Sequence, residues 1–144
     1  MTEFSVWGGN DGILSFLRSA APEVAWCNEN SRAYALVVLP GAAAVPETAV
    51  HTAVIPSHLP VTAKQVITYG LGQASTLTLS SFREDGCMIS LQRDIVTISG
   101  EKLLRQEIPL PPSDNPDLLL SLCGTLLAAG AAPEFNGFEF IGSC

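Results

Sequence analysis

Residues 76–91, TLTLSSFREDGCMISL, decide how the middle of this chain folds. Apolar side chains alternate with polar ones on both sides of Asp85-Gly86, which is the spacing of half-buried strands. Asp-Gly favours a tight hairpin, because the turn needs positive φ at its two central residues. A second turn at Ser99-Gly100 separates residues 95–98 from 103–110. We therefore predict a three-stranded antiparallel β-meander over residues 76–110.

The chain before this meander favours a mainly parallel, Rossmann-like sheet over residues 4–70. Asn10 can cap a helix after the first strand, and residues 42–49 fit either a loop or one short helix. Residues 33–39 are apolar on both faces of a strand, which predicts helices on both faces of the sheet. The expected strands are residues 4–7, 24–27, 33–39, 51–55 and 65–69.

A covering helix is predicted over residues 116–130. Asn115 supplies a cap, Pro116 suits the first turn, and Asp117 is an acid where the helix dipole favours one. Gly130 is placed to end the helix. The whole chain, residues 1–144, is thus expected to form a single α/β domain, with the meander continuing the parallel sheet.

Composition limits the partners. Charged residues make up 15% of the chain and hydrophobic residues 47%, so we expect a partner to cover part of the surface. The net charge of −7 repels phosphate backbones and anionic lipid, which disfavours nucleic acid and membrane surfaces. The apolar run over residues 118–132 falls short of the ~20 residues that a spanning helix needs.

The four cysteines, at positions 27, 87, 123 and 144, form no metal-like spacing with either histidine. The N-terminus carries no basic region followed by an apolar core, so we predict a reducing, cytoplasmic setting. His51 and His58 flank prolines without a carboxylate or cysteine nearby, and are interpreted as surface histidines. Gly70-Leu71-Gly72 is interpreted as a strand end. We expect no cofactor, no metal and no catalytic set.

One candidate binding site lies in the turn between the first strand and the first helix. Its residues are Gly8, Gly9, Asn10 and Gly12, with Glu29 at the end of the next strand. Backbone N–H groups at such a turn can hold an anion, and an acid about twenty residues on can bind a ribose. The glycine spacing differs from GxGxxG, and Asp11 would face the phosphates. An ordinary glycine turn is the alternative interpretation.

The C-terminal tail suggests an interface. Phe135, Phe138 and Phe140 would each leave a large apolar surface in water if the tail were frayed. The tail must therefore dock on its own domain or on a second copy, and we favour a homodimer.

Two functions compete at this point. The first is a non-catalytic domain that acts through self-association or as an accessory of a larger assembly. The second is a binding module for a nucleotide or another anionic small molecule at the Gly8–Gly12 turn. An enzyme that uses Cys87 or a histidine is a third, less favoured hypothesis.

Residues 64–130 resemble the later part of the Mur ligase central domain. The resemblance is carried by VITYGL at 66–71, the strand at 76–82, the hairpin, Ile108-Pro109-Leu110 and the helix at 118–130. It covers about half of the chain. The GKT or GKS phosphate loop, the His-Asn motif before the last helix and the C-terminal ligase domain of that family have no counterpart in this sequence. The resemblance therefore implies a reduced, non-catalytic relative without ligase chemistry.

Overall fold

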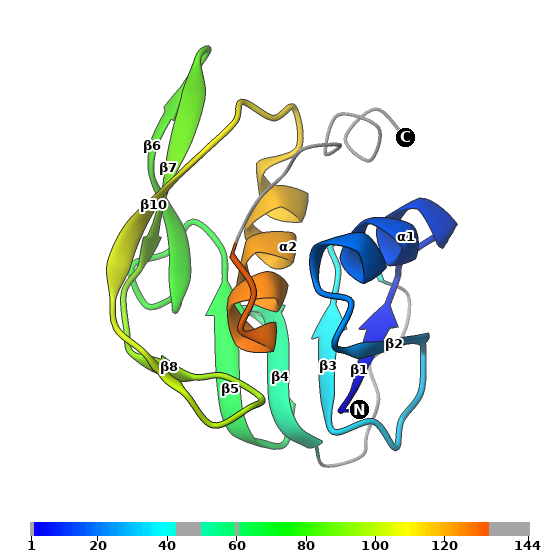
Figure 1. The fold of residues 1–144 in the computed structure, drawn as a ribbon. Helices are drawn as coiled ribbons and strands as arrows, with labels where there is room; N and C mark the ends of the chain where they lie inside the picture. Colours follow the sequence, from blue (N-terminus) through cyan, green and yellow to red (C-terminus); the bar gives the residue numbers. More distant parts are fainter. Residues whose placement is uncertain (1, 43–49, 60, 133–144) are drawn as a thin grey trace.

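The computed structural model describes residues 2–42, 50–59 and 61–132 (Figure 1). The first half contains β1 (Glu3–Trp7), α1 (Asp11–Ala20), β2 (Ala25–Asn28), β3 (Ala35–Val38), β4 (Val50–Pro56) and β5 (Ala63–Tyr69). The second half contains β6 (Leu77–Arg83), β7 (Gly86–Leu91), β8 (Ile95–Val96), β9 (Lys102–Leu103), β10 (Gln106–Leu110) and α2 (Pro116–Ala129). The predicted α/β fold is confirmed.

Eight of these strands form one mixed sheet in the order β10-β7-β6-β5-β4-β3-β1-β2. The pairs from β2 to β6 are parallel, and β7 and β10 then add antiparallel strands. The chain adds β2 on one side of β1 and β3 on the other, so the strand order reverses at β1. Because these strands are parallel, their carboxyl ends meet at one edge of the sheet, which is the edge where α/β folds bind their ligands.

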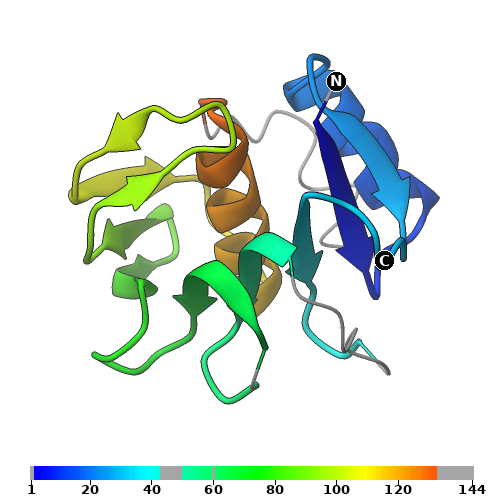
Figure 2. The same ribbon diagram turned by 90° about the horizontal axis from the view of Figure 1, so that it is seen from below.

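Both described helices pack on the same face of the sheet (Figures 1 and 2). In β3, Ala35 and Val37 face these helices, whereas Leu36 and Val38 belong to a second core cluster on the opposite face. The prediction of helices on both faces is therefore wrong for the described part of the chain. Short connections after β2 and β4 leave no room for a helix, and side chains from loops and strand ends take its place on that face. These are Ala42, Leu59 and Val61 from loops, Trp7 from the end of β1 and Ala63 from the start of β5. The segment 43–49 lies outside the described residues.

The helix boundaries follow the predicted caps. The Asn10 side chain accepts a hydrogen bond from Ile13 N at 2.9 Å, and the Asn115 side chain accepts one from Leu118 N at 3.2 Å. Gly130 ends α2 in a left-handed conformation. Helix α2 lies over β3 to β6, and every residue from position 118 to 129 is buried. It is therefore the central packing element of the described fold.

The predicted three-stranded antiparallel meander is confirmed and consists of β6, β7 and β10. The hairpin of β6 and β7 turns at Arg83–Gly86 as expected, and β10, which lies within the predicted run of residues 103–110, pairs with β7. Residues 95–103 differ from the prediction, because they form the separate two-stranded sheet of β8 and β9. This small sheet is fastened to β5, because the Gln65 side chain accepts from Val96 N at 2.9 Å and donates to Val96 O at 2.7 Å. After β9, the chain is held by a hydrogen bond that Arg105 N donates to the Asp94 side chain.

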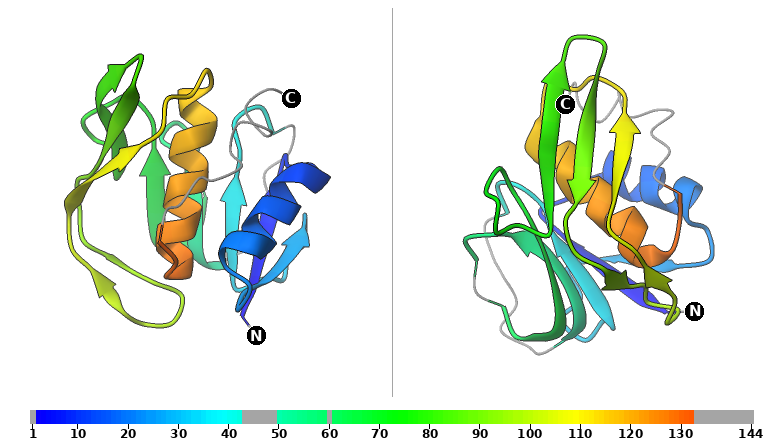
Figure 3. Two further views of the ribbon diagram at one scale, coloured as in Figure 1. Left: turned by 45° about the horizontal axis from the view of Figure 1, so that its top comes forward. Right: turned by 90° about the vertical axis from the view of Figure 1, so that its left-hand side faces the viewer.

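The hairpin of β6 and β7 rises beyond the carboxyl ends of the parallel strands, beside the start of α2 (Figures 1 and 3). No helix in the described residues is long and apolar enough to cross a membrane.

Candidate ligand pocket

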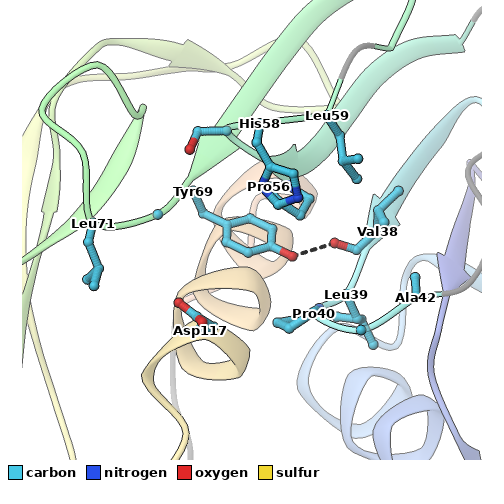
Figure 4. A pocket seen from close by; sticks show the side chains of 13 residues that line it. Val38, Leu39, Pro40, Ala42, Pro56, His58, Leu59, Tyr69, Leu71 and Asp117 are labelled. Atoms are coloured by element: carbon cyan, nitrogen blue, oxygen red, sulfur yellow. Dashed lines mark hydrogen bonds between the residues drawn. The ribbon is translucent and has the colours of Figure 1, made fainter.

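A pocket of about 700 Å³ opens at the carboxyl edge of the parallel sheet (Figure 4). Its walls come from the ends of three neighbouring strands, β3, β4 and β5, and from the first turn of α2. The lining segments are residues 38–42, 56–59 and 69–71, together with Asp117. Each segment contains a proline or a glycine at or just after the end of a strand, where the chain leaves the sheet.

Tyr69 forms one wall of the pocket and is only 3% exposed. Its hydroxyl donates a hydrogen bond to the Val38 carbonyl oxygen at 2.6 Å. Burial raises the pKa of Tyr69 well above its usual value, and the negative charge of Asp117 raises it further. The phenol is therefore a neutral donor, and this hydrogen bond holds the ring in place at the rim of the sheet.

His58 and Asp117 bring ionisable groups to the same pocket, one from the loop after β4 and one from the start of α2 (Figure 4). Both side chains are exposed to solvent. The remaining wall is largely apolar, with Leu39, Pro40 and Leu59 among its members. An apolar cavity with a few convergent polar groups is the usual composition of a small-molecule site.

Two serine hydroxyls flank Gly70, and one of them belongs to Ser57, which also lines the pocket. A Cβ atom on Gly70 would stand 3.0 Å from Ser57 Oγ and 3.4 Å from Ser75 Oγ, so a side chain there would crowd both hydroxyls. Ser75 is 1% exposed, and its Oγ finds no hydrogen-bond partner among the described residues. Glycine at position 70 thus leaves space for these two polar groups.

A second hollow of about 440 Å³ adjoins the first. Residues 79–81 of β6, Leu71 and Pro116 line it. Leu71 lines both hollows and is 71% exposed. The two spaces therefore meet beside the first turn of α2.

The Gly8–Gly12 turn lies next to this pocket. A Cβ atom on Gly8 would stand 2.8 Å from the Cβ of Ala42, which lines the pocket. The exposed Glu29 follows β2, and its N–H donates to Val6 O at 3.1 Å, so the structure brings the end of β2 to the end of β1. Asn10 Oδ1 accepts from the Ile13 N–H, and Gly9 and Gly12 lie on either side of this cap. Anion binding at this turn stays a prediction.

The other predicted candidates are placed as follows. Phe135, Phe138 and Phe140 lie outside the described residues. His51 was predicted to be a surface histidine. It is half-buried instead, and its ring stacks on that of Tyr34 with the ring centroids 4.4 Å apart.

Sequence reasoning missed the pocket residues Tyr69, Gly70 and Asp117 as a group. It interpreted Gly70 as part of a strand end and Asp117 as a helix-dipole acid, and both local statements hold. The available signal was that Pro40-Gly41, Pro56 and Gly70 each end a parallel strand. Such ends share one edge of the sheet, and that edge binds ligands in α/β folds.

Among the described residues, no group of three or more His, Cys, Asp or Glu side chains is arranged to hold a metal ion. Comparison of the chain with models of known protein families finds no match, and comparison with curated proteins finds none.

Proposed function

We propose that this protein is a non-catalytic binding module whose small-molecule ligand occupies the pocket at the ends of β3, β4 and β5. The observation that carries the proposal is the pocket itself, because about 700 Å³ lies within the range of ~300–1,000 Å³ typical of ligand sites. Its position at the carboxyl edge of a parallel sheet adds independent support.

Binding rather than catalysis suits the chemistry of the walls. Tyr69 is committed to the Val38 carbonyl and has a raised pKa, so it is a poor proton acceptor. The described cysteines, Cys27, Cys87 and Cys123, are absent from the residues that line the pocket, and burial raises the pKa of each thiol. A nucleophile activated by a lowered pKa is therefore lacking among the described pocket residues.

A ligand screen tests the proposal. We would measure thermal shifts with neutral, cationic and anionic compounds, including nucleotides and sugar nucleotides, since a ligand at a hundred times its dissociation constant adds about 2.7 kcal/mol to stability. Amide chemical shifts of Gly41, Gly70 and Leu71 should move with each true ligand.

A matched pair of variants locates the binding. His58→Trp places a large ring on the exposed rim of the pocket and should weaken binding, whereas Glu101→Trp, at an exposed turn between β8 and β9, should leave it unchanged. Hits that bind both variants equally, or a screen without a hit, would overturn the pocket as a ligand site.

Self-association is a second candidate function. It is supported by composition, because only 15% of the residues are charged and 47% are hydrophobic. Homodimer formation through Phe135, Phe138 and Phe140 remains part of this proposal.

Two further proposals are compatible with a ligand pocket and are not required by it. Anion binding at the Gly8–Gly12 turn would respond to the nucleotides in the same screen. Kinship with the Mur ligase central domain over residues 64–130 would make the protein a reduced relative.

A cytoplasmic location is also proposed, on the support that Cys27, Cys87 and Cys123 are all free thiols.

A further inference from the structure

The charges around the pocket are one-sided. The described residues that line it include one acidic side chain, Asp117, and one histidine, His58, but no lysine or arginine. The whole chain carries a net charge of −7, so the mean field adds to the local one. The pocket is therefore a negative environment.

The carboxylate of Asp117 is available for a ligand. Within the described part of the chain, the one ion pair joins Lys102 to Asp94, and no described basic residue pairs with Asp117. The Asp117 side chain is exposed, and the capping of α2 is done by Asn115 instead. Asp117 lines the pocket together with Tyr69, from the first turn of α2 (Figure 4).

The N-terminus of α2 carries a partial positive charge, which opposes the negative charge of the Asp117 carboxylate. A helix N-terminus is equivalent to about half of a positive charge, and one carboxylate carries a full negative charge. The carboxylate therefore outweighs the helix terminus, and this end of the pocket favours a cation over a phosphate or a carboxylate. The apolar part of a ligand can contact Leu39, Pro40 and Leu59 on the other walls.

We propose that the ligand is an organic amine, whose ammonium group pairs with Asp117 while its hydrocarbon body fills the apolar part of the pocket. This inference rests on the proposed function, because it names the ligand class for the same pocket. It differs from the predicted anion site at the Gly8–Gly12 turn in both place and charge.

Three probes of similar shape and different charge test it: 2-phenylethylamine, 2-phenylethanol and 3-phenylpropionate. Dissociation constants would be measured at pH 7 and low salt from the amide shifts of Gly41, Gly70 and Leu71. The amine should bind about three- to tenfold more tightly than the alcohol, and the carboxylate should bind most weakly. Added salt should reduce the preference, because the Asp117 carboxylate is exposed.

Two variants with the same change in net charge test whether the preference for the amine comes from the Asp117 carboxylate or from the overall negative charge of the protein. Asp117→Asn should bring the amine to the affinity of the alcohol and leave the alcohol unchanged. Asp114→Asn, an exposed acid three residues earlier and outside the pocket lining, should keep the preference. Loss of the preference in both variants would overturn the pairing with Asp117.

The remaining outcomes separate the proposal of an amine ligand from the proposal of a ligand pocket. Equal binding of all three probes would overturn the amine and retain a ligand pocket. Tightest binding of the carboxylate would do the same and favour an anion. If no probe shifts the pocket amides, the charge of the first hit in the wider screen decides, and a neutral or anionic hit overturns the amine. An empty screen overturns the pocket and the amine together.

Discussion

The hydroxyl of Tyr69, at the end of β5, donates a 2.6 Å hydrogen bond to the carbonyl oxygen of Val38, at the end of β3. Strand β4 lies between these two strands, so the bond crosses its carboxyl end. It fixes the separation of two pocket walls, and both partners are buried.

Replacing Tyr69 with Phe removes this bond with little change in shape. The Val38 carbonyl is then left buried without its partner, so we expect a loss of about 1–3 kcal/mol in the free energy of unfolding. Urea denaturation of Tyr69→Phe against wild type measures it. A variant as stable as wild type would show that water or another group satisfies Val38 O equally well.

The contact between α2 and the sheet sets the second prediction. A Cβ atom on Gly124 would stand 2.7 Å from Leu77 Cδ1 and 3.2 Å from Val54 Cγ1. Gly124→Ala gains about 1 kcal/mol of helix propensity but overpacks the core at a cost of about 1–3 kcal/mol, so we expect net destabilisation or no gain. A thermal midpoint clearly above that of wild type would contradict the close approach.

A double-mutant cycle locates the cause of that cost. Leu77→Ala removes the crowded side chain, and in its background Gly124→Ala should become neutral or stabilising. Equal effects of Gly124→Ala in both backgrounds would place the cost elsewhere.

Alkaline pH should destabilise the protein. Burial, and then the charge of Cys87, raises the pKa of Cys123 to about 12, from an unfolded value near 9.0. The folded state therefore holds its proton over this interval, so the contribution to stability is complete below about pH 9 and is lost as pH rises toward 12. The raised pKa of Tyr69 acts in the same direction above pH 10.

Urea midpoints between pH 7 and pH 10.5 measure this effect. Cys123→Ala should shift the midpoint at every pH, because it leaves a small cavity, and it should also flatten the decline above pH 9. A decline as steep in Cys123→Ala as in wild type would remove Cys123 from the explanation.

The tail prediction concerns residues 134–144, which lie outside the described part of the chain. Deleting them removes Phe135, Phe138 and Phe140, and each such ring contributes roughly 1.5–3 kcal/mol when buried. We expect wild type to sediment as a dimer and the shortened chain as a folded monomer. An unfolded product would assign the tail to its own core, and a dimeric product would assign the interface to another surface.

Local signals predicted most of the secondary structure. Asn10, Asn115 and Gly130 mark helix ends because their hydrogen bonds or backbone angles involve residues only a few positions away. All three strands of the meander were predicted, but residues 95–98 were expected to belong to it, and residues 95–96 pair with residues 102–103 in a separate small sheet instead. The Gln65 side chain bonds the Val96 backbone from 31 residues away, and the sequence carries no local mark of that contact.

By itself, the sequence determined the α/β class, the parallel first half, the hairpin at Asp85-Gly86 and the two capped helices, because periodicity and capping act over a few residues. Only the tertiary structure decided that both described helices share one face. It also brought residues 38–42, 56–59 and 69–71 together with Asp117 around one pocket. Each of these segments looks like an ordinary strand or helix end when read alone. They become a site because parallel pairing aligns strand ends that are distant along the chain, and because the packing of α2 places its first turn beside them.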